Sequence, residues 1–149
     1  MIDSTYSNRL FQKLLLEKKV PGLENHELIR REPAIGNHRF DFLLKKNEEE
    51  KFLELKSCTL FHKSIASFPD AVSERASEHV KLLAETGKGI IVFIILKQNM
   101  KYFIPNYHTD FTFYKTLKNC RDLIDIKALS INYNDNLDIT QLKEIPVLM

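Results

Sequence analysis

The sequence predicts an α/β fold of three layers, in which helices cover both faces of a mixed central sheet. The apolar, β-branched run at 89–96 is typical of a central strand that is buried on both faces. Apolar residues at helical spacing precede it at 70–85 and follow it at 110–119. Alternating residues at 30–56 predict three further strands. With 149 residues, the chain is expected to form a single domain.

The composition is that of an ordinary globular protein, with 44% hydrophobic and 28% charged residues. The net charge of +2 permits a nucleic-acid partner without requiring one. The longest apolar run is too short for a membrane span, and no signal-peptide pattern begins the chain. Cys58 and Cys120 are far apart, which predicts neither a zinc site nor a disulfide framework. We therefore expect a cytoplasmic protein that does not bind membranes.

The first expected helix spans 8–19, with Ser7 as its N-cap and Pro21-Gly22 at its end. Its apolar residues recur at helical spacing and are expected to cover the sheet; they are Leu10, Phe11, Leu14 and Leu15.

Two turns fix the pairing of the three strands that follow. Gly36-Asn37 predicts a two-residue hairpin loop, which places Glu32 opposite Asp41. The polar run 46–49 predicts the second loop, which places Asp41 opposite Glu54. Pro33 cannot donate to a strand ladder, so the first strand must be an edge or bulge there.

The period of two assigns side chains to opposite faces of these strands. The apolar face is expected to hold Phe40, Phe42, Leu44, Leu53 and Leu55, and the polar face Asp41, Glu54 and Lys56. Glu32, Asp41 and Glu54 would then form one row of carboxylates, which is unfavourable without a compensating cation. A hard divalent ion with oxygen ligands suits this row, with Lys56 beside it. A loop one residue longer would move Asp41 to the other face.

The helix at 70–85 is expected to begin at Asp70 as N-cap and to end before Gly87. Its buried stripe is expected to contain Val72, Ala76, Val80 and Leu83. Arg75 and His79 lie four residues apart beside that stripe. The pair suits contact with a phosphate, and equally suits a partly buried pair of structural side chains.

Beyond the central strand, the aromatic segment 102–108 is expected to be a loop. A helix at 110–119 follows, capped by Asp110 or Thr109. A last strand is expected at 123–133. The tail 137–149 is expected to pack through its apolar residues, which are Ile145, Val147 and Leu148.

Several segments, taken in order, resemble one known family. They include Arg39-Phe40-Asp41-Phe42-Leu43-Leu44, Leu53-Glu54-Leu55-Lys56-Ser57-Cys58-Thr59-Leu60, Phe68-Pro69-Asp70-Ala71-Val72-Ser73-Glu74-Arg75 with His79, and Ile145-Pro146-Val147-Leu148. Across essentially the whole chain, the pattern resembles the C-terminal domain of the sugar fermentation stimulation protein family. That domain is similar to the PD-(D/E)xK nucleases, so the resemblance implies a restriction-endonuclease-like core. The family's N-terminal OB-like domain is expected to be absent from residues 1–149.

The resemblance also implies roles for individual residues. Asp41 and Glu54 correspond to the ligands of Mg²⁺, for which Mn²⁺ can substitute, and Lys56 to the catalytic lysine that orients water. Glu32 corresponds to an acidic position near the site and is a further expected metal ligand. Arg39, Arg75 and His79 are expected to contact the substrate.

Two functions follow as hypotheses. The first is a Mg²⁺-dependent nuclease that hydrolyses phosphodiester bonds of DNA or RNA. The alternative is a non-catalytic nucleic-acid-binding or regulatory module of the same family. The expected partner is nucleic acid, DNA first. We expect this domain to bind it weakly alone, because the net charge is small, and expect a homodimer or a partner protein to assist.

Overall fold

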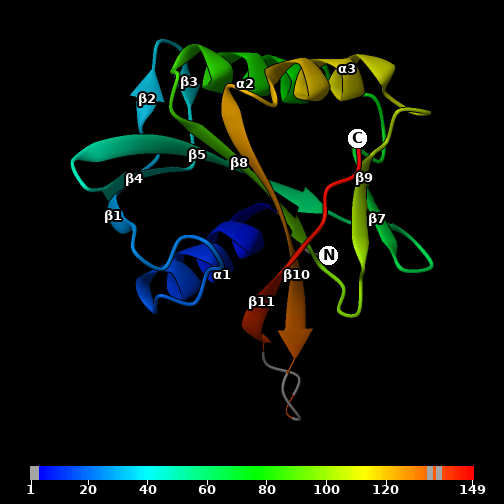
Figure 1. Cartoon of the computed structure of the whole chain (residues 1–149), viewed down its shortest axis with the longest axis horizontal. Coiled ribbons are helices and arrows are strands. Elements are labelled where there is room, and N and C mark those ends of the chain that lie inside the picture. The colour runs from blue at the N-terminus through cyan, green and yellow to red at the C-terminus, as the bar shows by residue number, and fades with distance from the viewer. Residues whose placement is uncertain (1–3, 134–135, 137–138) are drawn as a thin grey trace.

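The computed structural model describes residues 4–133, 136 and 139–149. Its centre is a six-stranded mixed sheet in the order β1-β4-β5-β8-β10-β11, with helix α1 on one face and helices α2 and α3 on the other (Figure 1). The described elements are α1 (Ser4–Leu16), β1 (Glu27–Arg31), β2 (Ala34–Ile35), β3 (His38–Arg39), β4 (Phe42–Lys46), β5 (Glu49–Cys58), β6 (Leu60–His62), β7 (Ile65–Phe68), α2 (Glu74–Glu85), β8 (Gly89–Ile95), β9 (Tyr102–Pro105), α3 (Phe111–Cys120), β10 (Ile124–Tyr133) and β11 (Ile139–Ile145). The predicted α/β class and mixed central sheet are confirmed.

The parallel strands β5, β8 and β10 form the middle of the sheet. Every residue of β8 is buried, because its side chains alternate between two hydrophobic clusters. Ile91, Phe93 and Ile95 pack on the side of α2 and α3, whereas Ile90, Val92 and Ile94 pack on the side of α1. The prediction of a central strand covered on both faces is therefore confirmed.

The second predicted turn is tighter than expected, but its register is confirmed. Asn47 and Glu48 have φ values of 51° and 67° and form a two-residue loop. Lys45 lies opposite Glu50, as predicted. The same register, continued past the end of β4, sets Asp41 opposite Glu54. The row of opposed carboxylates depends on the length of the turn, because a register shift of one residue would move every side chain of the strand to the other face of the sheet.

The first two predicted strands are each interrupted. The chain leaves β1 at Glu32, whose φ is 53°, and bends at Asp41 before β4. The predicted opposition of these residues is confirmed, since the Glu32 N–H donates to the Asp41 carbonyl over 2.9 Å. Beyond the break, β2 and β3 pair only with each other and turn toward α2 (Figure 1). The first strand was predicted to be an edge or to bulge at Pro33; β1 is an edge strand of the six-stranded sheet and ends at Arg31, before Pro33.

The bend at Asp41 overturns one predicted face. Phe40 was expected beside Phe42 and Leu44, but it packs in the cluster on the α2 side of the sheet. Phe42 and Leu44 pack in the cluster on the α1 side. A regular strand cannot do this, so the difference follows directly from the bend.

Helix starts also differ from the predictions. Helix α1 begins at Ser4, so Ser7 is an internal, buried residue instead of the N-cap. Helix α2 is capped by Ser73, whose side chain accepts from the Ala76 N–H, and not by Asp70. Val72 therefore precedes the helix and is 69% exposed, whereas its predicted partners in the stripe are buried. The Asp110 cap of α3 is confirmed.

The segment 102–108 is only partly a loop, because Tyr102–Pro105 forms β9 in a three-stranded sheet with β6 and β7. In the tail, Ile145 is buried and Val147 packs against the same core cluster, as expected, whereas the side chain of Leu148 is 43% exposed. The tail was predicted to start at Leu137, which lies outside the described residues. Among the helices that the structure describes, none is long and apolar enough to cross a membrane.

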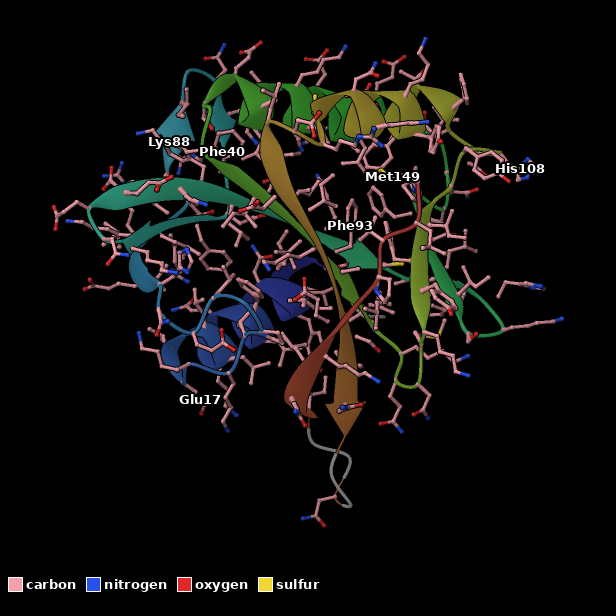
Figure 2. The ribbon with its side chains drawn as sticks, viewed as in Figure 1. Glu17, Phe40, Lys88, Phe93, His108 and Met149 are labelled. Carbon is pink, nitrogen blue, oxygen red and sulfur yellow. The ribbon has the colours of Figure 1, made fainter. Side chains whose placement is uncertain are left out.

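We predict that Phe93→Ala lowers the free energy of unfolding by about 3–5 kcal/mol, because its ring is fully buried and stacks on Phe103 with centroids 4.4 Å apart (Figure 2). Phe111→Ala is the matched control. Its ring is 59% exposed, so a change within about 0.5 kcal/mol is expected. Urea denaturation of both variants measures the difference, and equal losses would contradict the assigned core.

Candidate metal and catalytic site

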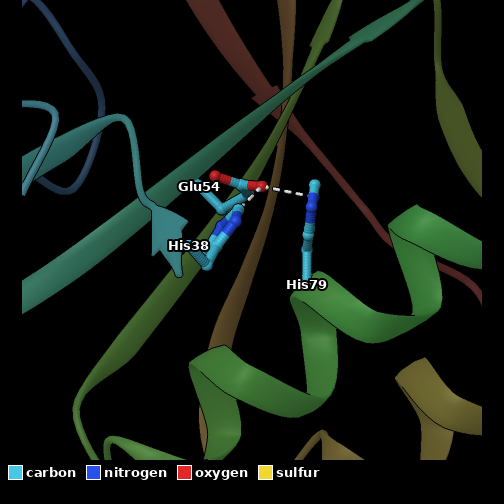
Figure 3. A group of neighbouring side chains, drawn as sticks. All are labelled: His38, Glu54 and His79. Carbon is cyan, nitrogen blue, oxygen red and sulfur yellow. Dashed lines mark ion pairs between the residues drawn. The ribbon is translucent and has the colours of Figure 1, made fainter. Parts of the chain in front are cut away.

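A buried carboxylate lies at the centre of the candidate site. Glu54 is on β5, with only 5% of its side chain exposed. Its Oε2 atom lies 2.8 Å from His79 Nδ1, 3.3 Å from Lys56 Nζ and 3.6 Å from His38 Nε2. Figure 3 shows His38 and His79 approaching it from β3 and α2. Because a buried charge requires partners, these three nitrogens explain how Glu54 stays in the interior.

Lys56, Glu54 and His79 form a triangle. Lys56 Nζ is 2.8 Å from His79 Nδ1, the same ring atom that lies 2.8 Å from Glu54 Oε2. Nδ1 donates to the carboxylate only when it carries a proton, and accepts from Lys56 only when it does not. The tautomer and protonation of His79 therefore decide which of the two contacts is a hydrogen bond from or to Nδ1.

Asp41 is held beside this triangle by groups from two elements. Its Oδ2 accepts from the Leu55 N–H over 2.7 Å, and its Oδ1 accepts from Asn8 Nδ2 of α1 over 3.0 Å. The preceding residue, Ser7, lies 2.6 Å from Ser57 between their hydroxyl oxygens. Helix α1 thus packs directly under the site and fixes the position of Asp41.

The two carboxyl groups differ in proton affinity. Burial and the negative charge of Glu54 raise the pKa of Asp41 from 3.8 to about 6. Burial alone would also raise the pKa of Glu54, but the hydrogen bond with His79 and the charge of Lys56 lower it below its ordinary value. Asp41 therefore holds a proton more tightly than Glu54 does.

His38 belongs to the site, although the sequence analysis did not select it. Burial lowers its pKa, and the charge of Glu54 opposes that effect. Its Nε2 atom is buried and has no hydrogen-bond partner among the described residues. Its ring contacts the His79 ring, with centroids 4.1 Å apart, and the edge of Phe40. In the sequence, His38 stands two residues before Phe40, which would place both side chains on the same face of a regular strand. Because the chain bends at Asp41, the sequence does not show which face of the sheet His38 and Phe40 occupy.

A groove of about 600 Å³ runs between the β2–β3 turn and α2 and reaches the site. His38 and His79 line its inner end, and Arg75 lines it from an exposed position on α2. Glu74 and Glu78 also line it, so the groove carries charges of both signs.

Some of the predicted site residues meet at Glu54, and others do not. The structure brings together Asp41, Glu54, Lys56 and His79. Arg39 is exposed on β3 and is not among the residues lining the groove, and Glu32 is exposed beside the bend. A ligand role for Glu32 and substrate contact by Arg39 and Arg75 stay predictions.

Comparison with known proteins gives the family. The model described as the sugar fermentation stimulation protein RE domain matches residues 5–136. The chain belongs to the sugar fermentation stimulation protein family. The resemblance seen in the sequence is therefore confirmed.

Relatives in this family are longer than the present chain. A sugar fermentation stimulation protein homolog of Clostridium botulinum is 35% identical, with 97% of this chain and 66% of the relative covered. A homolog of Methanosphaera stadtmanae is 38% identical, over 78% of this chain and 50% of the relative. The chain spans about two thirds of the length of the first of these. The solved structure of Pyrococcus furiosus SfsA in complex with Ca²⁺ has a TM-score of 0.88 and 31% identity, covering 100% of this chain and 67% of that one.

We predict that Asp41→Asn raises stability near pH 7 in chelating buffer. The folded state holds the Asp41 proton up to about pH 6, whereas the unfolded chain releases it near 3.8. The wild type therefore loses stability as pH rises between these values, by about 3 kcal/mol in total. The variant, which cannot ionise, lacks this loss.

Urea denaturation from pH 3 to pH 7 measures the difference between the two proteins. It should be smallest at pH 3 and grow through pH 6. If the difference in free energy of unfolding did not change with pH, Asp41 would have an ordinary pKa and would not be destabilised by burial and the charge of Glu54.

Proposed function

We propose that this domain is a metal-dependent nuclease, which hydrolyses phosphodiester bonds with Asp41, Glu54 and Lys56. The single observation that carries the proposal is the meeting of two carboxyl groups and a lysine in one site, where burial and the charge of Glu54 raise the pKa of Asp41. A stable fold seldom buries two neighbouring carboxylates unless they serve a ligand or a reaction.

The restriction-endonuclease-like classification of the core is part of this proposal. In its support, Asp41 directly precedes β4, the strand that pairs with β5, and Glu54-Leu55-Lys56 lies on β5 itself beside the parallel strand β8. This is the arrangement expected for an Asp and a Glu-x-Lys motif in PD-(D/E)xK nucleases, to which the family's domain is similar.

The donor atoms fit a divalent cation. Asp41 and Glu54 supply carboxylate oxygens, which Mg²⁺, Mn²⁺ and Ca²⁺ prefer, and a cation would relieve the repulsion between them. The Ca²⁺ complex of the Pyrococcus furiosus relative supports a divalent ion in this family. When bound, such an ion supplies positive charge to the scissile phosphate and lowers the pKa of a water. We propose Mg²⁺ as the physiological ion.

Side chains of the protein would supply the other catalytic roles. Lys56 Nζ lies 3.3 Å from Glu54, and we expect it to donate to the attacking water and to the charge that develops on phosphate. His79 fixes the orientation of Glu54 through their 2.8 Å contact. In the balanced reaction the water oxygen bonds to phosphorus, the bond to the leaving sugar oxygen breaks, and that oxygen gains a proton from the water. The products are a phosphate monoester and an alcohol.

The groove supports an extended nucleic-acid substrate that this domain holds weakly. Arg75 offers a cation at its edge, with Arg39 nearby on β3, but Glu74 and Glu78 repel a polyanion. We therefore propose DNA as the first substrate to test, with a second subunit or a partner protein to supply additional basic surface.

Cleavage of labelled single-stranded and double-stranded DNA and RNA tests this function. We expect metal-dependent cleavage by the wild type, and a fall of about 100-fold or more for Lys56→Met, because one pre-organised charged group is lost while the stem volume is kept. Lys51→Met is the matched control. It makes the same change on the same strand, where Lys51 pairs with Asp125.

All three proteins are purified identically. Equal cleavage by wild type and Lys56→Met would indicate a contaminating nuclease or another active site, and the proposal would fail. Binding without cleavage by any of the three would favour the non-catalytic nucleic-acid-binding module.

A further inference from the structure

A second set of donor atoms surrounds Glu54, and its chemistry differs from that of the carboxylate pair. His38, Glu54 and His79 each offer one ligand atom, and the three atoms lie within 4.8 Å of one another. Asp41 is not a member of this set. Two imidazole nitrogens with one carboxylate are ligands that suit Zn²⁺, Co²⁺ and Mn²⁺ better than Mg²⁺ or Ca²⁺.

The spacing of the atoms is close to what one ion requires. Donors bound to one zinc ion at about 2.1 Å lie roughly 3–4 Å apart. Glu54 Oε2 is 3.6 Å from His38 Nε2 and 2.8 Å from His79 Nδ1. Only small side-chain movements would place all three around a common centre.

His38 provides an independent observation. Within the part of the chain that the structure describes, its buried Nε2 atom has no hydrogen-bond partner, although an unpaired buried polar atom is costly. The ring is held by Phe40 and His79 so that this nitrogen stays near the Glu54 carboxylate (Figure 3). A metal ion would satisfy the nitrogen without moving the backbone of β3.

Lys56 already brings a cation to the same atoms. Its Nζ lies 3.3 Å from Glu54 Oε2 and 2.8 Å from His79 Nδ1, two of the three donors. A metal ion must displace this group, so Lys56 lowers the affinity of the site.

From these contacts we propose that His38, Glu54 and His79 form a binding site for a first-row transition-metal ion such as Zn²⁺ or Co²⁺. The site goes beyond the proposed nuclease function, with which it shares the Glu54 carboxylate and the His79 ring that orients it. Since one carboxylate serves both sets, Zn²⁺ and Mg²⁺ compete for the protein.

Titration of the metal-free full chain with Co²⁺, followed by visible absorption, tests the site. One equivalent should give the bands of nitrogen-bound Co²⁺, and Zn²⁺ should remove them. His38→Gln and His79→Gln should each weaken Co²⁺ binding at least tenfold. Lys56→Met should bind Co²⁺ more tightly than the wild type. His108→Gln is the matched control, since His108 is exposed at the opposite edge of the molecule from Phe40 (Figure 2).

Asp41→Asn separates this inference from the nuclease proposal. The Asp41→Asn variant should lose Mg²⁺-dependent cleavage of nucleic acid. Its Co²⁺ absorption spectrum should equal that of the wild type. Wild-type affinity and spectrum in both histidine variants would overturn the inference. If either variant does not fold, X-ray absorption of the Zn²⁺-loaded wild type decides instead, with two imidazole ligands expected and fewer than two overturning it.

Discussion

The pairing of the buried Glu54 carboxylate with nitrogens from three elements is the interaction on which the site depends. Lys56 comes from the same strand, His79 from α2 and His38 from the β2–β3 hairpin. Removing one partner of a buried charge commonly costs about 3–5 kcal/mol, so the contacts of Glu54 add to the core packing that joins these elements. The same contacts keep Glu54 ionised and leave the proton of the carboxyl pair on Asp41.

The fold supports that pairing in two ways. The parallel strands β5 and β8 are buried on both faces, which gives Glu54 and Lys56 a rigid base. The break at Glu32 and the bend at Asp41 then turn β2 and β3 toward α2. Without this turn, His38 would follow the plane of the sheet and could not reach Glu54. A left-handed residue at Glu32 is unfavourable by itself and persists where the surrounding structure holds it.

Sequence reasoning succeeded where local chemistry fixes geometry. Gly36-Asn37 and the polar run after Lys46 determine the hairpin registers, so the opposition of Asp41 and Glu54 could be derived by counting. The fully apolar pattern of 89–96 likewise identified the central strand. These signals lie within a few residues of the structures that they specify.

The local sequence pattern does not predict features that depend on contacts between residues far apart in the chain. The bend at Asp41 is fixed by the Leu55 N–H and by Asn8 of α1, which no local pattern reveals, so Phe40 was assigned to the wrong face and His38 was missed. Ser73 displaced Asp70 as the cap of α2, and with that shift Val72 moved out of the buried stripe. Both residues are good caps by composition, and tertiary packing selects between them.

If Glu54 anchors a divalent ion in this protein, a crystal soaked in Mn²⁺ should reveal it in an anomalous difference map. We expect an anomalous peak in bonding contact with a Glu54 carboxylate oxygen, with Asp41 or the two imidazoles as further ligands. A fully occupied Mn²⁺ peak elsewhere, with none beside Glu54, would contradict it.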